Sequence, residues 1–204
     1  MRSVKSWRLA LPGLAILLWL AACATVPRST GHVEPWPQRL ASLQAITQFT
    51  LQGRLAVTVS HEGTNDGFSA GVRWQQRGDE AAVDLSAPLG FGAAHVVEQA
   101  DRLTVTTSRG EVLDDDAAAA QLKAQLGFEP PLASLRYWLL GASDPGSAAE
   151  PTLDAEQRLV ALTQNGWQLQ YEDYVLQGQR WLPRRLTLSR PGLRLRLIVN
   201  DWQF

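Results

Sequence analysis

The sequence of 204 residues predicts an α+β fold in which one curved antiparallel β-sheet carries its helices on a single face. Two observations lead to this prediction. Apolar and polar residues alternate in short segments of the first and last thirds of the chain, which is typical of antiparallel strands with one buried face. The middle third instead holds two helix-forming segments, 117–126 and 132–140. The order of strands, helices and strands favours one sheet with helices packed against it.

A short helix precedes the first strand. Leu40, Leu43 and Ile46 recur at helical spacing, which predicts one apolar face. Two clusters, 63–67 and 77–80, contain the Gly and Asp residues that predict hairpin loops. Alternation predicts four strands around and after them, over 51–59, 68–74, 81–85 and 103–107.

The two central helices have recognisable ends. Three acids at 114–116 lead into the first helix, where negative charge suits the helix dipole, so they do not indicate a metal. Gly127 ends this helix. Pro130 and Pro131 begin the second helix, which ends at Gly141. Its residues Leu132, Leu135, Trp138 and Leu139 are expected to share one face.

The last third returns to strands. Gln164, Asn165 and Gly166 predict a tight hairpin turn. Alternating segments predict strands over 167–171, 186–188 and 193–199. The last of these alternates most regularly.

Residues 1–22 have the layout of a secretory signal. A basic start is followed by an apolar run, 9–19, that is too short to span a bilayer, and then by Ala21 and Ala22. Cys23, the only cysteine of the chain, comes directly after these small residues. This arrangement resembles a bacterial lipobox, in which the cysteine is acylated and the signal is cut before it. The alternative is an ordinary secreted protein in which the cysteine is incidental.

Composition sets further limits. Removal of residues 1–22 takes away three basic residues and no acid, which leaves 182 residues with a net charge of −4. This charge gives no reason to expect nucleic-acid binding. Segment 23–37 is rich in Pro, Thr and Ser and is expected to be a lipidated tether. Residues 38–204 are expected to form one domain, without an intramolecular disulfide and monomeric.

The sequence offers weak signals for catalysis. Segment 67–71 matches the G-x-S-x-G pattern of serine hydrolases, which makes a lipid-anchored esterase using Ser69 an alternative function. However, Ser69 lies in an alternating segment and is not followed by a helix, as the pattern requires. His32, His61 and His95 have no metal-ligand spacing. We therefore expect no catalytic residue, no metal and no cofactor, and a protein that is not an enzyme.

The residues that do suggest a function are apolar or basic. Segment 87–92 should form a turn with Leu89 at its tip and Phe91 nearby, either folded onto the core or exposed to a membrane. The tryptophans after the signal could fill a core or line a cavity. A filled core would make the protein a structural outer-membrane lipoprotein, which is a further alternative function. Six arginines lie between Arg180 and Arg196. A solvated strand face explains most of them, and attraction to anionic lipid is the alternative.

Several stretches together resemble the LolB family of outer-membrane lipoprotein receptors in Gram-negative bacteria. They occur in family order and extend over nearly all of the chain after Cys23. The matching stretches are Arg73-Trp74-Gln75-Gln76, Pro88-Leu89-Gly90, Pro131 to Gly141, Asn165-Gly166-Trp167 and Asn200-Asp201-Trp202.

The resemblance implies an incomplete antiparallel β-barrel whose open side is capped by helices over a hydrophobic cavity. It implies a receptor that accepts mature lipoproteins from the periplasmic carrier LolA and inserts them into the outer membrane. The implied partners are thus LolA, acylated lipoprotein cargo and outer-membrane lipid. The family's exposed apolar loop residue falls on Leu89, with Phe91 beside it. The expected acyl-chain cavity residues are Trp74, Leu135, Trp138, Leu139 and Trp167.

Overall fold

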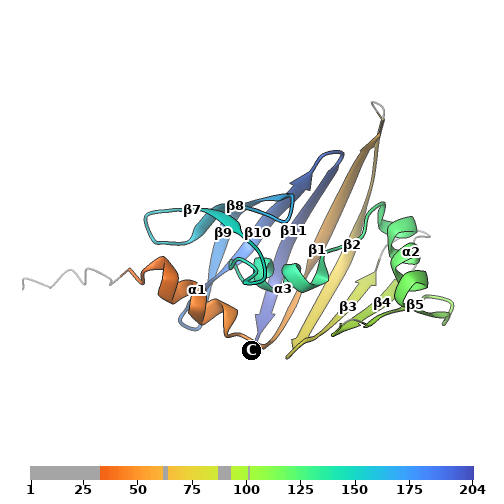
Figure 1. Cartoon of the computed structure of the whole chain (residues 1–204), viewed down its shortest axis with the longest axis horizontal. Coiled ribbons are helices and arrows are strands. Elements are labelled where there is room, and N and C mark those ends of the chain that lie inside the picture. The colour runs from red at the N-terminus through yellow and green to blue at the C-terminus, as the bar shows by residue number, and fades with distance from the viewer. Residues whose placement is uncertain (1–32, 62–63, 87–92, 101) are drawn as a thin grey trace, which may run out of the picture. The chain divides into compact units, whose positions relative to one another are not determined.

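Eleven antiparallel strands form one sheet in the computed structural model of the chain (Figure 1). The structure describes residues 33–61, 64–86, 93–100 and 102–204. Cys23, the signal, most of the tether and the loop residues Leu89 and Phe91 lie outside the described residues. The described part belongs to one compact unit, Val33–Phe204.

Strands that are consecutive in the chain are neighbours in the sheet, except β6 and β7, and the first strand pairs with the last. Their spatial order is β6-β5-β4-β3-β2-β1-β11-β10-β9-β8-β7, so β6 and β7 are edges and the sheet is not closed. This confirms the predicted α+β class and the incomplete barrel. The strands are β1 (Gln48–His61), β2 (Thr64–Arg77), β3 (Glu80–Ser86), β4 (Ala93–Gln99), β5 (Arg102–Thr107), β6 (Val112–Asp114), β7 (Ala149–Leu153), β8 (Leu159–Gln164), β9 (Trp167–Gln177), β10 (Arg180–Arg190) and β11 (Leu193–Gln203).

The alternation seen in the sequence separates the two faces of this sheet. In β11, Leu193, Leu195, Leu197 and Val199 are buried on the concave face, and the residues between them are exposed or half-buried. The helices lie on that concave face (Figure 1). Each Å² of apolar surface buried on this side contributes about 25 cal/mol, and this gain drives the packing of the helices against the sheet.

The pairing of the two central strands, β1 and β11, is interrupted by a β-bulge. Gln52 pairs with Asp201 and the next residue, Gly53, pairs with Val199, so one residue of β11 has no partner there. A Cβ atom on Gly53 would lie 2.3 Å from the carbonyl oxygen of Ile198. Glycine is therefore required where the two backbones approach, and the bulge increases the local bend of the sheet.

The described residues form three helices beside the sheet: α1 (Trp36–Gln44), α2 (Asp115–Leu126) and α3 (Leu132–Leu139). Gly127, with φ of 79°, ends α2 as predicted, and Gly141, with φ of 78°, follows α3. The tether was expected to reach residue 37, but α1 already begins at Trp36, because Pro35 and Pro37 fit the first turn of a helix. None of the helices in the described ranges is long and apolar enough to cross a bilayer.

The sequence missed two kinds of local structure. The predicted loop at 63–67 is mostly strand, since pairing continues to His61 opposite Thr64, and Gly67 lies opposite Thr58. Strands β6, β7 and β8 were not predicted. Pro151 interrupts the strand pattern of β7, and an edge strand tolerates a proline because one side of it makes no ladder hydrogen bonds.

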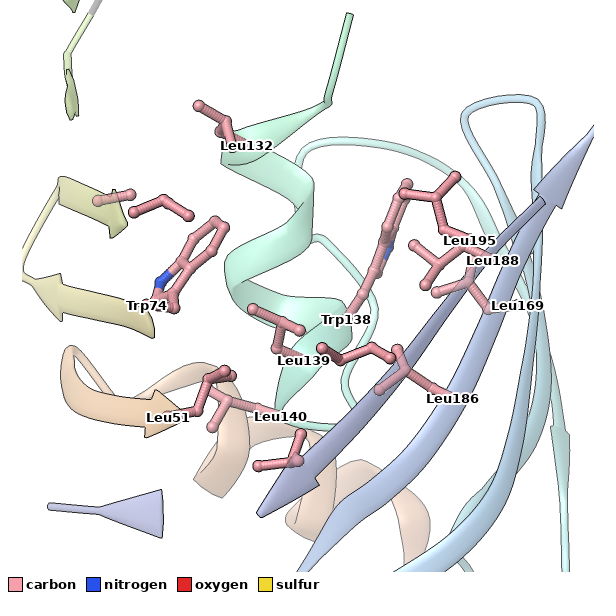
Figure 2. Packing of buried hydrophobic residues seen from close by; sticks show 14 of the residues in the cluster. Leu51, Trp74, Leu132, Trp138, Leu139, Leu140, Leu169, Leu186, Leu188 and Leu195 are labelled. Atoms are coloured by element: carbon pink, nitrogen blue, oxygen red, sulfur yellow. The ribbon is translucent and has the colours of Figure 1, made fainter. Parts of the chain in front are cut away.

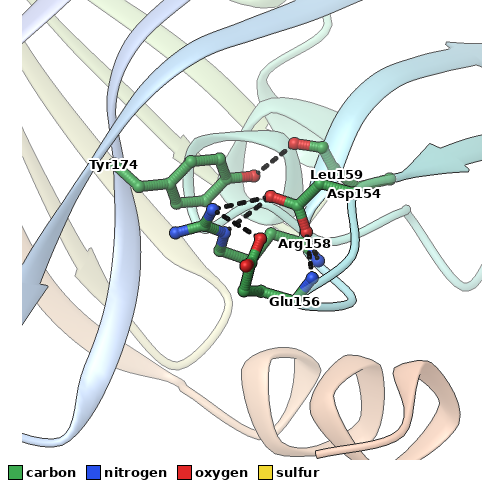
Figure 3. Close-up of polar contacts among 5 residues, drawn as sticks. All are labelled: Asp154, Glu156, Arg158, Leu159 and Tyr174. Atoms are coloured by element: carbon green, nitrogen blue, oxygen red, sulfur yellow. Dashed lines mark hydrogen bonds and ion pairs between the residues drawn. The ribbon is translucent and has the colours of Figure 1, made fainter. Parts of the chain in front are cut away.

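The turn between β7 and β8 is held by one carboxylate. Asp154 Oδ1 accepts hydrogen bonds from the backbone N–H groups of Glu156 (3.0 Å) and Arg158 (2.8 Å), and Oδ2 accepts from Arg158 Nε at 2.8 Å (Figure 3). The Arg158 guanidinium lies over the rings of Tyr174 and Trp181. Partial burial opposes ionisation of Asp154, but the hydrogen bonds and charge of Arg158 outweigh it and lower the pKa of this carboxyl.

We expect Asp154→Asn to lower the free energy of unfolding by about 1 kcal/mol at pH 7. Because the folded-state pKa of Asp154 lies below its unfolded value, its contribution is complete above about pH 4 and is lost as the pH falls through the folded-state pKa. Urea unfolding at pH 7, 5 and 3 measures this, with the exposed Asp66→Asn as control. A difference from the unmutated protein that stays constant down to pH 3 would contradict it.

Candidate ligand cavity

An apolar cavity of about 90 Å³ lies between helices α2 and α3 and the concave face of the sheet. It draws residues from both helices, from the segment between them and from strands on both sides of β1. Every lining residue is apolar. They are Leu51, Leu55, Val72, Trp74, Val83, Leu85, Val96, Leu122, Leu126, Phe128, Pro130, Leu132, Leu135, Leu139, Leu188, Leu195 and Leu197.

The cavity suits hydrocarbon but is small. A site without polar groups gives water no hydrogen-bond partners, so such a space favours apolar atoms over water. An engineered protein cavity of about 150 Å³ holds a benzene molecule. At about 90 Å³, the present space is smaller than that and takes only part of a long acyl chain. A form that encloses such a chain must be wider.

Three of the five residues predicted for this cavity lie on its wall. Trp74 reaches it from β2, and Leu135 and Leu139 reach it from successive turns of α3. Trp138 and Trp167 are not among the residues that line it. Trp138 is fully buried, and its ring centroid lies 6.3 Å from that of Trp167. These two rings pack against each other between α3 and the strands that carry Gln164 and Trp167.

Figure 2 shows the physical reason for this difference. Trp74 and Trp138 lie on opposite sides of α3, and Trp138 faces Leu169, Leu188 and Leu195 on the strands. The indole N–H of Trp138 donates to Gln164 Oε1 at 2.8 Å. A buried indole N–H needs such a partner, and this one fixes the ring away from the cavity.

Many residues that line the cavity were not predicted from the sequence. Val72, Val83 and Val96 reach the cavity from β2, β3 and β4 at inward-facing positions. Phe128 and Pro130 come from the segment between the two helices. The alternation of β2 and β3 marked which residues share a face. The sequence contained no signal that this face meets a cavity.

Helix α3 is fixed in place by a polar network. The side-chain amide of Gln164, which is 2% exposed, accepts from Trp138 and from the backbone N–H of Asp144 (2.9 Å). It donates to the Asp144 carbonyl at 2.8 Å and to Ser147. Ser134 of α3 donates to Asp144 at 2.6 Å and accepts from Asn165 at 3.1 Å. The helix thus forms a firm wall of the cavity.

Helix α2 is held differently. Asp115 accepts from the backbone N–H of Leu103 at its first turn, and neighbouring Asp114 accepts from Thr104. Beyond Asp115, no side chain of α2 makes a hydrogen bond or ion pair within the described ranges. Leu122 and Leu126 attach this helix to the cavity by apolar contact alone. Of the two helices, α2 has fewer side-chain hydrogen bonds to the rest of the described residues.

The hydrolase pattern does not fit its required geometry. Ser69 lies within β2, opposite Ala56 of β1, and not at a turn between a strand and a helix. His95 lies in β4, where its Nδ1 is 2.6 Å from Asp84 Oδ1 across the sheet. The described residues contain no group of three His, Cys, Asp or Glu that could hold a metal ion.

Three of the six arginines in the segment Arg180–Arg196 form ion pairs. Arg196 lies 3.1 Å from Glu172, and Arg184 lies 3.8 Å from Asp173. Hydrogen bonding from Thr187, followed by the charges of Arg196 and Arg185, lowers the pKa of Glu172 despite partial burial. These ion pairs fit the interpretation that the basic residues belong to a solvated strand face.

Comparison with known proteins identifies the family. A model of the family described as outer membrane lipoprotein LolB matches residues 47–202. The chain belongs to the LolB family. Outer-membrane lipoprotein LolB of Nitrosococcus oceani is 35% identical over 204 residues, covering 98% of this chain and 99% of the relative. LolB of Nitrosomonas europaea is 35% identical over 195 residues, covering 93% of this chain and 90% of the relative.

Solved structures show the same fold at much lower identity. A LolA superfamily protein from Nitrosomonas europaea has a TM-score of 0.53 and 9% identity, covering 84% of this chain and 94% of that one. A DUF1329 family protein from Desulfovibrio piger has a TM-score of 0.54 and 9% identity, covering 81% and 89%. LolB-family membership supports a role in outer-membrane lipoprotein reception, and the names of the relatives support an outer-membrane location.

Proposed function

We propose that this protein is the outer-membrane receptor that takes acylated lipoproteins from the periplasmic carrier LolA and inserts them into the outer membrane, without catalysing a reaction. The carrier, the lipoprotein cargo and outer-membrane lipid are its partners. Acylated Cys23 anchors it on the periplasmic side. The observation that carries this proposal is the wholly apolar cavity between α2, α3 and the sheet, in a chain of the LolB family.

The energetics explain why a cavity is needed. A triacylated lipoprotein carries on the order of forty methylenes, and each costs about 0.8 kcal/mol to expose to water. Free diffusion through an aqueous compartment is therefore excluded, and each carrier must cover the chains in turn. Handover proceeds when the receptor holds the chains more favourably than LolA does, and the bilayer holds them more favourably still.

Acceptance of a chain requires the cavity to widen. Helix α3 is tied to the loop residue Asp144 by Ser134 and to β8 by Trp138, whereas α2 beyond Asp115 is attached by apolar residues that include Leu122 and Leu126. Apolar contacts with a ligand can replace the apolar contacts that α2 loses, at little net cost. We infer that α2 moves away from the sheet when cargo enters.

The delivery step uses the loop at 87–92. Leu89 and Phe91 would insert into the membrane surface and so hold the cavity close to the bilayer. The loop joins β3 and β4, two strands that contribute to the cavity wall. An apolar loop that connects two strands of the cavity wall would give the acyl chains a short route into the bilayer.

Leu135→Trp tests the cavity. Leu135 lines it and is half-buried, so a larger ring at this position would fill the space. We expect at least tenfold less lipoprotein accepted from LolA, with the thermal midpoint lowered by only a few degrees. Leu176→Trp adds the same ring on an exposed strand position and should accept cargo normally. Unimpaired acceptance by a folded Leu135→Trp protein would exclude the cavity as the acyl site.

A further inference from the structure

A second, polar pocket of about 340 Å³ lies at one end of the apolar cavity. Leu132 lines both spaces, and α3 forms a wall of each. Leu135 and Leu139 face the cavity, whereas Arg136 and Tyr137 face the pocket. One short helix therefore separates an apolar space from a polar one.

The strands lead from one space directly into the other. On β4, Val96 lines the cavity and Glu98, two residues further along the same face, lines the pocket. On β2 the corresponding change is from Trp74 to Gln76, and the Trp74 indole donates to Gln76 Oε1 at 3.0 Å. The concave face is thus continuous, with an apolar middle and a polar end.

Two charged groups in this pocket have unused bonding capacity. Arg136 has a side chain that is only 14% exposed, yet its one acidic partner is Asp79, 3.2 Å away and 89% exposed. Glu98 is half-buried on the concave face and has no hydrogen-bond or ion-pair partner among the described residues. Burial raises the pKa of Glu98, as expected for a carboxyl without a partner.

The charges of the pocket select a type of ligand. Asp79, Glu98 and Asp144 outnumber Arg136, so a simple anion is disfavoured. Asp144 already accepts hydrogen bonds from Ser134 and from the backbone of Gly146. This leaves Arg136 as a donor for an anionic oxygen and Glu98 as an acceptor for a primary ammonium group.

We propose that this pocket binds the zwitterionic head group of an aminophospholipid, with phosphate on Arg136 and ammonium on Glu98, while an acyl chain enters the adjoining cavity. This inference rests on the proposed function in one respect, because it needs the cavity to accept hydrocarbon. It adds a ligand class, a glycerophospholipid with a primary amine, to the acylated proteins.

Short-chain lipids test the proposal with the chain from residue 23 onward carrying Cys23→Ala. Dihexanoyl phosphatidylethanolamine and dihexanoyl phosphatidylglycerol compete for the protein with a fluorescent fatty acid. We expect the ethanolamine lipid to bind at least fivefold more tightly. Glu98→Gln should abolish this preference, Arg136→Gln should weaken both lipids, and the exposed Glu111→Gln should change neither.

The outcomes separate this inference from the proposed function. If the fatty acid binds and an acylated lipopeptide displaces it, but both phospholipids bind equally, the head-group site is wrong and the receptor function stands. A preference that survives in Glu98→Gln also overturns the site. If neither the fatty acid nor the lipopeptide binds, the cavity does not accept hydrocarbon, and both proposals fail.

Discussion

Gln164→Leu is expected to lower the free energy of unfolding by about 3 to 5 kcal/mol. The substitution is close in volume but removes every hydrogen bond of the amide. It leaves the Trp138 indole N–H and the backbone N–H and carbonyl of Asp144 buried without this partner. Each buried group left unsatisfied costs about 1 to 3 kcal/mol, which supports the size of the effect.

Urea unfolding followed by tryptophan fluorescence measures this loss. Gln168→Leu makes the same chemical change at an exposed position of β9 and should shift stability by less than about 0.5 kcal/mol. Stability of Gln164→Leu within about 1 kcal/mol of the unmutated protein would show that the network does not hold α3. We expect the variant also to accept less lipoprotein, because a wall of the cavity loosens.

Leu89→Glu is expected to separate acceptance of cargo from its delivery. The variant should take lipoprotein from LolA at the normal rate, since the proposal assigns Leu89 to the membrane step and not to binding of the acyl chains. Delivery to liposomes should fall about tenfold or more, because a carboxylate resists entry into the apolar region of a bilayer. A transfer assay with purified carrier, receptor and liposomes measures the two steps separately.

The matched control for this variant is Leu176→Glu. Leu176 is an exposed leucine of β9, on another part of the sheet. The same charge placed there should leave both acceptance and delivery unchanged. Normal delivery by Leu89→Glu, or equal losses in the two variants, would remove the loop from the mechanism.

The strands with regular alternation were predictable because their pattern reflects one buried face. Segment 193–199 was expected to be a strand, and its Leu195 and Leu197 do face the cavity. The contact between His95 of β4 and Asp84 was not predictable, because it depends on which strand lies beside β4.

The cavity could be predicted only in part. Leu135 and Trp138 are three residues apart on an amphipathic helix, and the sequence places both on its apolar side. Leu135 lines the cavity, whereas Trp138 is held away from it by a hydrogen bond to Gln164, a residue 26 positions later in the chain. A contact at this distance is a property of the tertiary fold. Local periodicity identifies an apolar face but does not show which part of it remains unfilled.

The most direct test of the central claim is to ask which face of β2 touches the acyl chains. Val72 lines the cavity, and its neighbour Arg73 is exposed on the opposite face. A photoreactive benzoylphenylalanine at each position, illuminated after transfer from LolA, would mark any acyl chain within reach. The account predicts crosslinking to the chains of the lipoprotein from position 72 and none from position 73. Equal crosslinking from both, or crosslinking from 73 alone, would contradict it.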